Sequence, residues 1–552
     1  MKVVIVGGVA GGASCAARLR RLDESAEIVM VERGPYVSYA NCGLPYYVGG
    51  VIEQESSLFV ANEDTFRGQF AIDVRTRCEA IKINPEQKTV DLRSVVTGEV
   101  VSESYDKLVL SPGAAPIRPN LPGIDLPGIF SVRTVPDVRH IREWLAASNT
   151  LSGLESYSGF QTVVKKRAVV IGGGFIGLEM AENLVHLGLD VTLIQRGNQI
   201  LGPMDLEMAR YVERFVEQKG IHLVLNDGSA GFRQTEKGTL EALTQSGKAF
   251  PADIVVLGIG VQPEIELAQT AGLEIGQRKG IRVDDQMHTS NPDIFAVGDA
   301  VEVKDFNTGE WTLVALAGPA NRQGRIAADV ICGRDSRFRG TQGTAIIGLF
   351  GAAAAWTGVN EKTLKRLGDT DYEKVYIYPN SHAGYYPGAK MLAIKLLFRK
   401  SDGKVLGAQA LGLDGVDKRI DAFAMAIQFG ATIYDLEETE LTYAPQFGGA
   451  KSPVNFAAMV AANILRGDMP VTHWDQLGDG FLLDVRHAEE LAVESVPGAV
   501  NIDLVHLRER LDELPRDRKI LVFCRSGQRA HYAVRLLLQH GFNARNISGG
   551  MM

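Results

Sequence analysis

Long apolar runs and paired cysteines are both missing from this sequence. None of its 552 residues belongs to a run of about 18 apolar residues, the length a membrane helix needs, and MKVVIVGGVAGG has too short an apolar core for a signal peptide. The cysteines are too scattered for a disulfide framework or a metal site. They are Cys15, Cys42, Cys78, Cys332 and Cys524. We expect a cytoplasmic protein without a membrane partner, in which a functional cysteine is nucleophilic or redox-active.

An excess of positive charge is also absent. The 58 lysines and arginines against 66 acidic residues give a net charge of −8, and no basic domain stands out, which excludes the footprint of a nucleic-acid binder. Glycine, in contrast, is abundant at 60 residues. Such an excess is typical of α/β proteins whose backbone turns tightly around nucleotides. The length predicts three or four domains.

Strand-like runs recur ahead of glycine loops, with helical stretches between them. This alternation predicts parallel sheets covered by helices. Farther on, alternating segments predict an antiparallel sheet followed by a helix, and the last 85 or so residues predict another α/β unit. The expected strands are Val3–Val6, Leu108–Leu110, Ala168–Ile171, Val255–Leu257, Ile294–Val297, Lys374–Tyr378, Met391–Phe398, Phe481–Val485 and Ile520–Phe523. The expected helices are Ala13–Leu22, Phe175–Leu187, Asp417–Phe429, Leu504–Leu511 and Ala530–His540.

Two segments about 165 residues apart carry the pattern of a dinucleotide-binding turn. In VVIVGGVAGG, Gly7 and Gly12 match the outer glycines of the fingerprint while Val9 replaces the middle one, and Glu32 closes the next strand, where a carboxylate binds ribose hydroxyls. A helix N-terminus with unpaired N–H groups suits a phosphate. The alternative is a tight strand–helix turn without a ligand.

The second segment, AVVIGGGFIG, contains the complete fingerprint in Gly172, Gly174 and Gly177. Its following strand ends at Gln195, where an NAD-specific site would carry an acidic residue. Arg196 comes next and has the charge to meet a 2′-phosphate, although a solvated arginine explains it equally well. A second nucleotide is expected here, and the choice between NADH and NADPH stays open.

Together with TSNPDIFAVGDA and YDKLVLSPGAAP, these segments resemble the disulfide reductases with two dinucleotide-binding folds over residues 1 to about 455. The resemblance implies FAD in the first module, with Asp299 on the ribityl hydroxyls, and NAD(P)H in the second. The implied FAD contacts are Gly7, Gly8, Ala10, Gly11, Gly12, Glu32, Arg33, Asn41, Ser111, Pro112, Gly113, Arg133, Asp299 and Ala317. The implied NAD(P)H contacts are Gly172, Gly174, Ile176, Gly177, Gln195, Arg196 and Gly260.

The redox cysteine of such a family usually belongs to a CxxxxC or CxxC pair, and neither pair occurs here. A single cysteine, Cys42, stands in the polar loop SYANCGLPYY. A lone thiol beside a flavin can hold a mixed disulfide, a sulfenate or a persulfide; the alternative is a buried structural cysteine. We favour structural roles for Cys15, Cys78 and Cys332.

The loop around Cys42 resembles that of coenzyme A-disulfide reductases. The alternative is an NADH oxidase or peroxidase that cycles Cys42 through a sulfenate. Such relatives carry a histidine in the first glycine loop, where this chain has Ala10, the residue typical of the coenzyme A branch, so Ala10 argues against this alternative. The coenzyme A contacts implied by the resemblance are Ser14, Arg18, Arg21, Ser38, Asn41 and Lys451. Arg18 and Arg21 share a helix face that suits phosphate groups; solvated arginines are the plainer explanation.

HAGYYPGAK and LTYAPQFGGAKSP resemble the dimerisation domain of the same family, and so imply a homodimer. There a tyrosine from each segment reaches the cysteine of the partner subunit. Tyr443 matches one position. For the other we prefer Tyr385 over its neighbour Tyr386, and packing in an interface would explain either tyrosine without a catalytic role.

The C-terminal unit resembles rhodanese in LLDVR, PGAVNI, CRSGQRA and ISGG. Cys524 lies between a strand and a helix, in a loop whose N–H groups and helix N-terminus would stabilise a persulfide anion, with Arg529 closing the loop. Rhodanese domains usually continue through one more helix beyond this point, so an incomplete domain is one interpretation.

These observations predict an FAD-dependent NAD(P)H reductase of coenzyme A persulfide, coenzyme A disulfide or polysulfide, acting through Cys42, with sulfur transfer at Cys524. A sulfur carrier that acts mainly through its rhodanese domain is the non-reductase alternative. The fold class is α/β. The expected domains are FAD-binding at 1–112 and 251–330, NAD(P)H-binding at 113–250, dimerisation at 331–455 and rhodanese at 468–552. A polar insertion at 148–166 is either a flap over a substrate groove or a passive loop.

Overall fold

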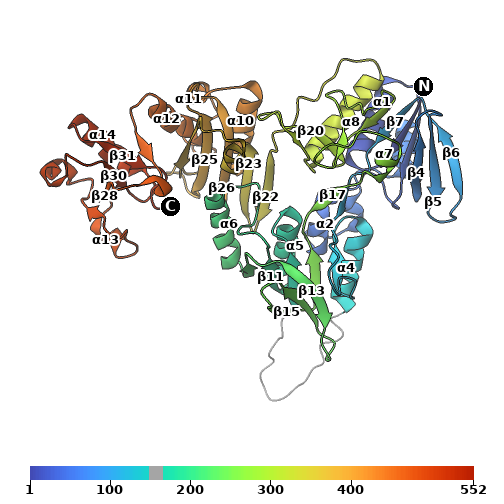
Figure 1. Cartoon of the computed structure of the whole chain (residues 1–552), viewed down its shortest axis with the longest axis horizontal. Helices are drawn as coiled ribbons and strands as arrows, with labels where there is room; N and C mark the ends of the chain where they lie inside the picture. The colour runs from blue at the N-terminus through green and yellow to red at the C-terminus, as the bar shows by residue number, and fades with distance from the viewer. Residues whose placement is uncertain (148–165) are drawn as a thin grey trace. The chain divides into compact units, whose positions relative to one another are not determined.

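The computed structural model describes residues 1–147 and 166–552 (Figure 1), so the predicted insertion lies outside the described residues except for Lys166. The chain divides into two compact units. The first comprises 1–202 and 213–343, and the second comprises 203–212 and 344–552. In the part of the chain that is described, every helix is too short or too polar to cross a membrane.

The N-terminal module of the first unit is built on a five-stranded parallel sheet. In spatial order its strands are β19 (Ile294–Ala296), β7 (Lys107–Leu110), β1 (Lys2–Val6), β2 (Glu27–Glu32) and β3 (Asp73–Thr76). Helices α1 (Ala10–Leu22) and α8 (Ala317–Ile331) lie side by side (Figure 1). They can approach closely because Gly324 has no side chain: a Cβ there would lie only 2.2 Å from the carbonyl oxygen of Gly11. The parallel sheet predicted here is confirmed.

The second module repeats this plan. Its parallel sheet has the order β12 (Ile221–Val224), β11 (Asp190–Ile194), β10 (Arg167–Ile171), β16 (Ile254–Leu257) and β9 (Ile129–Ser131). Its helices are α4 (Val135–Ala147), α5 (Phe175–His186) and the C-terminal part of α6 (Leu206–Gln218). The strands Val191–Ile194 and Ile254–Leu257 are almost entirely buried, as expected for a sheet covered on both faces.

Smaller elements complete the first unit. They are β4 (Cys78–Asn84), β5 (Thr89–Ser94), β6 (Val100–Ser104), β8 (Ala114–Pro116), β13 (Ser229–Gln234), β14 (Leu240–Thr244), β15 (Ala249–Ala252), β17 (Val261–Pro263), β18 (Ile281–Arg282), β20 (Val301–Lys304), β21 (Trp311–Thr312), η1 (Asn41–Gly43), α2 (Leu44–Val48), η2 (Glu55–Leu58), α3 (Glu63–Phe70) and α7 (Glu266–Thr270). β8 and β17 pair antiparallel where the chain passes between the two modules.

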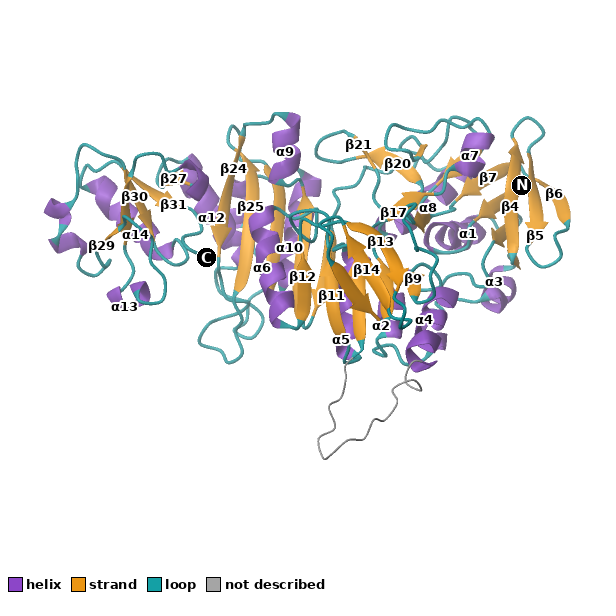
Figure 2. Cartoon of the chain, turned by 60° about the horizontal axis from the view of Figure 1, so that its bottom comes forward, coloured by secondary structure: helices purple, strands orange, loops and turns teal. Residues whose placement is uncertain are grey.

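The second unit begins with an antiparallel sheet, as predicted. Its order is β22 (Ala345–Leu349), β23 (Ala352–Gly358), β26 (Val405–Gly412), β25 (Leu392–Arg399) and β24 (Tyr372–Ile377). The helices of this part are α9 (Glu361–Leu367), α10 (Val416–Phe429), α11 (Ile433–Glu438) and α12 (Pro453–Leu465). α10 packs against β23 and β26 (Figure 1). α12 packs against β24, and the two are drawn next to each other in Figure 2.

The C-terminal part contains a parallel sheet with the order β27 (Val471–Thr472), β31 (Ala544–Ile547), β30 (Ile520–Phe523), β28 (Phe481–Asp484) and β29 (Val500–Asn501). Its helical elements are η4 (Trp474–Gln476), α13 (Ala488–Leu491), η5 (Leu507–Glu509), η6 (Leu511–Glu513) and α14 (Gln528–Gln539).

The predicted helix Leu504–Leu511 is wrong, because that segment forms only two single 3₁₀ turns, η5 and η6. The Asp503 side chain accepts a bond from the N–H of Val505 and so begins a tight turn. Leu514 is extended with ψ 140°, the conformation favoured before a proline. The apolar spacing of this segment reflects the burial of Leu507 and Leu514 instead.

A buried ion cluster joins residues 203–212 to the antiparallel sheet. The ammonium group of Lys395, on β25, is fully buried and contacts the carboxylates of Asp205 at 2.8 Å, Glu361 at 2.5 Å and Glu207. Burial alone would raise the pKa of Glu361, yet Lys395 and Lys374 lower it to about 2. The carboxylates of these three acids lie close enough together to hold a cation. The ammonium group of Lys395 supplies the positive charge among them.

Replacing Lys395 by methionine should therefore destabilise the second unit by about 3–5 kcal/mol, because buried carboxylates lose their counter-charge. Calorimetry of the unfolding transition measures the loss. Lys365→Met is the matched control: this lysine also contacts Glu361, at 3.5 Å, but is 63% exposed, and the change should stay within about 0.5 kcal/mol. Equal losses of stability in the two variants would contradict the role of Lys395 as the buried counter-charge.

Candidate functional site

The first glycine turn brings the end of β1 against the start of α1. Gly7 has φ +97°, and a Cβ there would lie 2.0 Å from the Ser111 carbonyl oxygen. A Cβ at Gly12 would lie 1.9 Å from the Gly7 carbonyl oxygen, and one at Gly11 would lie 2.9 Å from the Ser111 hydroxyl. Backbone therefore excludes a side chain at Gly7 and at Gly12, whereas one at Gly11 would require neighbouring side chains to shift. The turn brings together the predicted residues Gly7, Gly11, Gly12 and Ser111.

Glu32, at the end of β2, is held by this turn. Its carboxylate accepts hydrogen bonds from the N–H groups of Gly8 at 3.0 Å and Gly34 at 2.8 Å. This geometry places an acceptor at the carboxyl end of the sheet, where a ribose would lie.

Glu264 links two other residues that were predicted to contact FAD. Its carboxylate contacts the guanidinium groups of Arg33 at 3.1 Å and Arg133 at 2.6 Å. Although burial opposes the charge, both arginines help to lower the pKa of Glu264. Nothing in the local sequence pattern marked Glu264, because its two partners come from distant segments.

Asp299 follows Gly298 at the end of β19, at the same edge of the sheet. Burial raises its pKa, and Arg133 opposes that rise. The N–H of Gly298 donates to the Gln323 side chain of α8 at 2.7 Å, which fixes this turn against the helix. Pro112 and Gly113 follow β7, Ala317 is the first residue of α8, and Asn41 is exposed in η1.

The second glycine turn repeats the first. Gly172 has φ +106°, and a Cβ at Gly177 would lie 1.9 Å from its carbonyl oxygen. Gln195 accepts a hydrogen bond from the N–H of Gly173 at 3.0 Å, as Glu32 does from Gly8. Gly174 has open space above its Cα, which leaves room for a ligand.

The remaining predicted contacts of this module lie around that turn. Ile176 lies in the first turn of α5 and Arg196 is exposed after β11. Gly260, with φ +108°, accepts a bond from Ile117 next to the β8–β17 pair.

The residues present fit FAD and a nicotinamide dinucleotide. Neither α1 nor α5 has a side-chain cap or an acidic residue in its first turn, and a helix N-terminus of this kind favours the binding of a phosphate. Other helices of comparable length, such as α4, α6 and α10, carry an acid there.

Cys42 lies in η1, directly before α2, and its side chain is exposed. The surrounding protein still raises the pKa of the thiol through partial burial, and the carboxylates of Glu179 and Asp299 raise it further. The other thiols of this unit differ: Cys15 is fully buried, and burial raises its pKa to about 12. Cys78 and Cys332 are intermediate in exposure.

Glu179 is a residue of this site that the motif analysis missed. It stands two residues after Gly177 on α5 and accepts a hydrogen bond from the hydroxyl of Tyr46, on α2, at 3.3 Å. Burial raises the pKa of Glu179 to about 7, and Glu182 adds to the rise while Tyr46 opposes it. A carboxyl group with this pKa changes its charge near neutral pH beside the Cys42 thiol.

The predicted coenzyme A contacts of the first unit have different surroundings. Arg18 forms an ion pair with Asp329 of α8 at 2.7 Å, whereas Arg21 is exposed. The hydroxyl of Ser14 donates to the Asn321 side chain. Ser38 has φ +47° and donates its N–H to the Gly8 carbonyl.

In the second unit, the hydroxyl groups of Tyr385 and Tyr443 are hydrogen-bonded at 2.9 Å. Tyr385 is 75% exposed and Tyr443 is 48% exposed. Tyr386 instead packs its ring edge-on against His382. Lys451 is exposed in the segment before α12.

Cys524 follows β30 and is 1% exposed. The loop turns at Gly527, with φ +87°, into α14, whose N-terminus has no side-chain cap. Arg529 forms two bonds to Glu490, at 2.5 and 2.8 Å, and these lower the pKa of Glu490 to about 2. Glu490 is a second residue that sequence reasoning missed.

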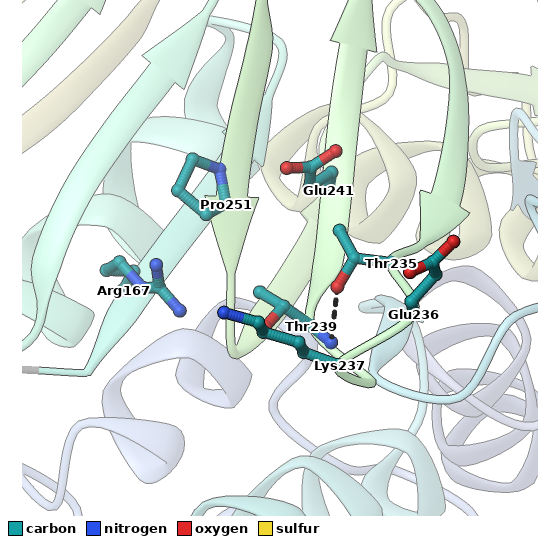
Figure 3. Close-up of a pocket in the computed structure, with 7 residues that line it drawn as sticks. All are labelled: Arg167, Thr235, Glu236, Lys237, Thr239, Glu241 and Pro251. Carbon is teal, nitrogen blue, oxygen red and sulfur yellow. Dashed lines mark hydrogen bonds between the residues drawn. The ribbon is translucent and has the colours of Figure 1, made fainter.

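A pocket of about 500 Å³ lies elsewhere, between the start of β10 and the β13–β14 hairpin (Figure 3). It is lined by polar residues, among them Arg167, Thr235 and Lys237, and Thr235 accepts a bond from the N–H of Thr239. Arg167 is at the amino end of β10, while nucleotides bind at the carboxyl ends of parallel strands. The pocket therefore contributes nothing to the site described above.

Comparison with known families gives three matches. Residues 1–324 match the pyridine nucleotide-disulphide oxidoreductase family, 345–451 match the dimerisation domain of that family, and 469–552 match the rhodanese-like domain.

Several individual proteins are similar. Coenzyme A disulfide reductase from Staphylococcus epidermidis is 35% identical over 455 residues, which is 82% of this chain and 98% of the relative. The crystal structure of reduced Bacillus anthracis CoADR-RHD shares 46% identity and a TM-score of 0.94, covering 100% of this chain and 96% of that one. An NAD-dependent persulfide reductase from A. fulgidus shares 37% identity and a TM-score of 0.91, covering 100% and 99%.

Replacing Glu179 by glutamine should lower the pH at which Cys42 reacts with iodoacetamide. Above pH 7 the ionised Glu179 disfavours the thiolate, so removing its charge should shift the midpoint down by roughly half to one pH unit. Peptide mass spectrometry of the reduced holoenzyme follows Cys42 alone. Glu266→Gln, at an exposed position on α7, should leave the midpoint in place. An unchanged midpoint in Glu179→Gln would show that the two groups do not interact.

Proposed function

The chain belongs to the pyridine nucleotide-disulphide oxidoreductase family, and on this premise we propose that it is an FAD-dependent NAD(P)H reductase of coenzyme A persulfide and disulfide. The family implies FAD and a nicotinamide nucleotide as cofactors. The coenzyme A specificity is our proposal, supported by the names of the similar proteins and by Ala10, which stands where the oxidase and peroxidase relatives carry a histidine.

One observation carries the proposal: Cys42 is an exposed thiol beside the two nucleotide modules, without a neighbouring cysteine in its loop. A disulfide within the protein is therefore not the reducible group. The sulfur that pairs with Cys42 must come from a small molecule, and the product must leave as a thiol or as sulfide.

The reaction of Cys42 follows from its position. The thiolate attacks the coenzyme A-bound sulfur of the persulfide, a mixed disulfide forms between Cys42 and coenzyme A, and hydrosulfide leaves. When bound, FAD supplies a two-electron relay from NAD(P)H to this disulfide. Cys42 returns to the thiolate while coenzyme A takes the proton and departs. The sum converts a persulfide and NADH to a thiol, hydrosulfide and NAD⁺.

Coenzyme A would lie along α1 and the Ser38–Asn41 segment. Arg21 is exposed and available to a phosphate, while Asp329 fixes the orientation of Arg18. Lys451 is proposed as a further contact. The functional protein is proposed to be a homodimer in which Tyr385 and Tyr443 reach the redox cysteine of the partner subunit.

The rhodanese domain is proposed to supply the persulfide. Cys524 would accept sulfane sulfur and pass it to a small thiol, which is then reduced at Cys42. Glu490 raises the pKa of the Arg529 guanidinium most, and the Cys524 side chain adds to that rise. Arg529 therefore lies beside Cys524. Such a positive charge stabilises an anionic persulfide.

The two cysteines should therefore be separable. Cys42→Ser should abolish NADH-dependent reduction of coenzyme A persulfide and disulfide while the bound FAD keeps its absorbance spectrum. Cys524→Ala should keep that reduction within about twofold and abolish sulfur transfer from thiosulfate. Steady-state assays of both reactions on both variants measure this. Wild-type reductase turnover in Cys42→Ser would refute the mechanism.

NADH should be preferred over NADPH, although weakly. Gln195 bonds the glycine turn as an acid would, but it has no charge to repel a 2′-phosphate. Gln195→Glu should widen the preference for NADH by roughly tenfold in kcat/KM. Arg196→Ala should lower the kcat/KM for NADPH by roughly threefold and leave NADH unchanged. A wild-type enzyme that is faster with NADPH would overturn this assignment.

A further inference from the structure

The segment from Gly549 to Met552 lies between the Cys524 loop and β24 of the antiparallel sheet. Both neighbours belong to the second unit, although they are separated by about 150 residues of sequence. The segment follows β31 and contains the final glycines of the ISGG motif.

On one side, the segment supports the backbone of the Cys524 loop. The N–H of Met551 donates to the carbonyls of Cys524 at 3.1 Å and Arg525 at 3.0 Å, and the N–H of Met552 donates to Arg525 at 3.1 Å. A Cβ at Gly550 would lie 2.4 Å from the Cys524 carbonyl oxygen. Hydrogen bonds from this segment therefore fix the positions of two carbonyl groups of the loop, those of Cys524 and Arg525.

On the other side, the segment rests on two tyrosines. A Cβ at Gly549, whose φ is +83°, would lie 3.2 Å from Cβ and 3.3 Å from Cγ of Tyr376 on β24. The hydroxyl of Tyr378 donates to the Met552 carbonyl at 3.3 Å. Tyr376 is itself immobilised, because its hydroxyl donates to Glu207 at 2.7 Å.

Two residues next to β27 strengthen this contact. The Nε2 atom of His473 lies 2.9 Å from the Glu373 carboxylate of β24, and the His473 side chain is 7% exposed. The indole N–H of Trp474 donates to the Gly550 carbonyl at 2.6 Å, and its ring packs edge-on against Phe523. The residues next to β27 thus contact both the strand that precedes Cys524 and β24, the edge strand of the antiparallel sheet.

We propose that Tyr376 and Tyr378 are positioning residues for sulfur transfer at Cys524, acting through residues 549–552. The inference rests on the proposed sulfurtransferase role of Cys524. The loop stabilises a persulfide only if its N–H groups converge on the sulfur, and that convergence depends on where its carbonyls are held. The rhodanese site is therefore completed by a strand of another domain.

The test uses the full-length holoenzyme and the transfer of sulfur from thiosulfate to cyanide. In this reaction the Cys524 thiolate takes the sulfane sulfur, sulfite leaves, and cyanide removes the sulfur as thiocyanate. Tyr376→Leu removes the ring that supports Gly549, and kcat should fall about tenfold with KM for thiosulfate within about twofold, because the loop loses its geometry more than its charge. Tyr376→Phe keeps the ring and should retain the wild-type kcat within about twofold.

NADH-dependent reduction at Cys42 serves as the internal control, and it should be unchanged in both variants. Wild-type transfer by Tyr376→Leu overturns the inference, and so does an equal loss in Tyr376→Phe, which would point to the Glu207 bond instead. If calorimetry shows that Tyr376→Leu does not fold, Tyr378→Phe decides: we expect kcat to fall about threefold, and no change overturns the inference. Full transfer by Cys524→Ala would instead refute the sulfurtransferase role itself.

Discussion

Close backbone contact at the two glycine turns is the constraint on which the rest of the first unit depends. In each turn the last glycine lies so close to the first that an added Cβ would be 1.9 Å from a carbonyl oxygen. That contact brings each helix N-terminus over the carboxyl end of its sheet. This edge carries Glu32 and Asp299 in the first sheet and Gln195 in the second. Cys42 follows in the chain soon after Glu32, so its placement depends on the same turn.

Much of this arrangement is predictable because it is encoded locally. A buried strand, a glycine turn and a helix follow one another within about 20 residues, so their pattern can be recognised without knowledge of the rest of the fold. The same holds for Cys524 between β30 and α14. The helix predicted at Leu504–Leu511 failed for a local reason too: a turn at Asp503 and a proline after Leu514 outweigh its apolar periodicity.

The residues that escaped prediction act across long separations in sequence. Glu264 joins Arg33 and Arg133, Glu490 holds Arg529, and Glu179 meets Tyr46, which is 133 residues away. Each is an ordinary acid in its own segment. Only the tertiary fold distinguishes it from a solvated one, because burial and an exact partner define its role. A single sequence carries no signal for such pairs.

The Lys395 cluster has a consequence for how this protein can be divided. The antiparallel sheet looks like a portable module at residues 344–465, yet two of the carboxylates around its buried lysine come from residues 203–212. An excised sheet would carry a buried ammonium group with Glu361 as its remaining partner from that cluster. Recombination between related genes at this border would therefore have to exchange both segments together, because two separate stretches of the sequence encode one structural unit.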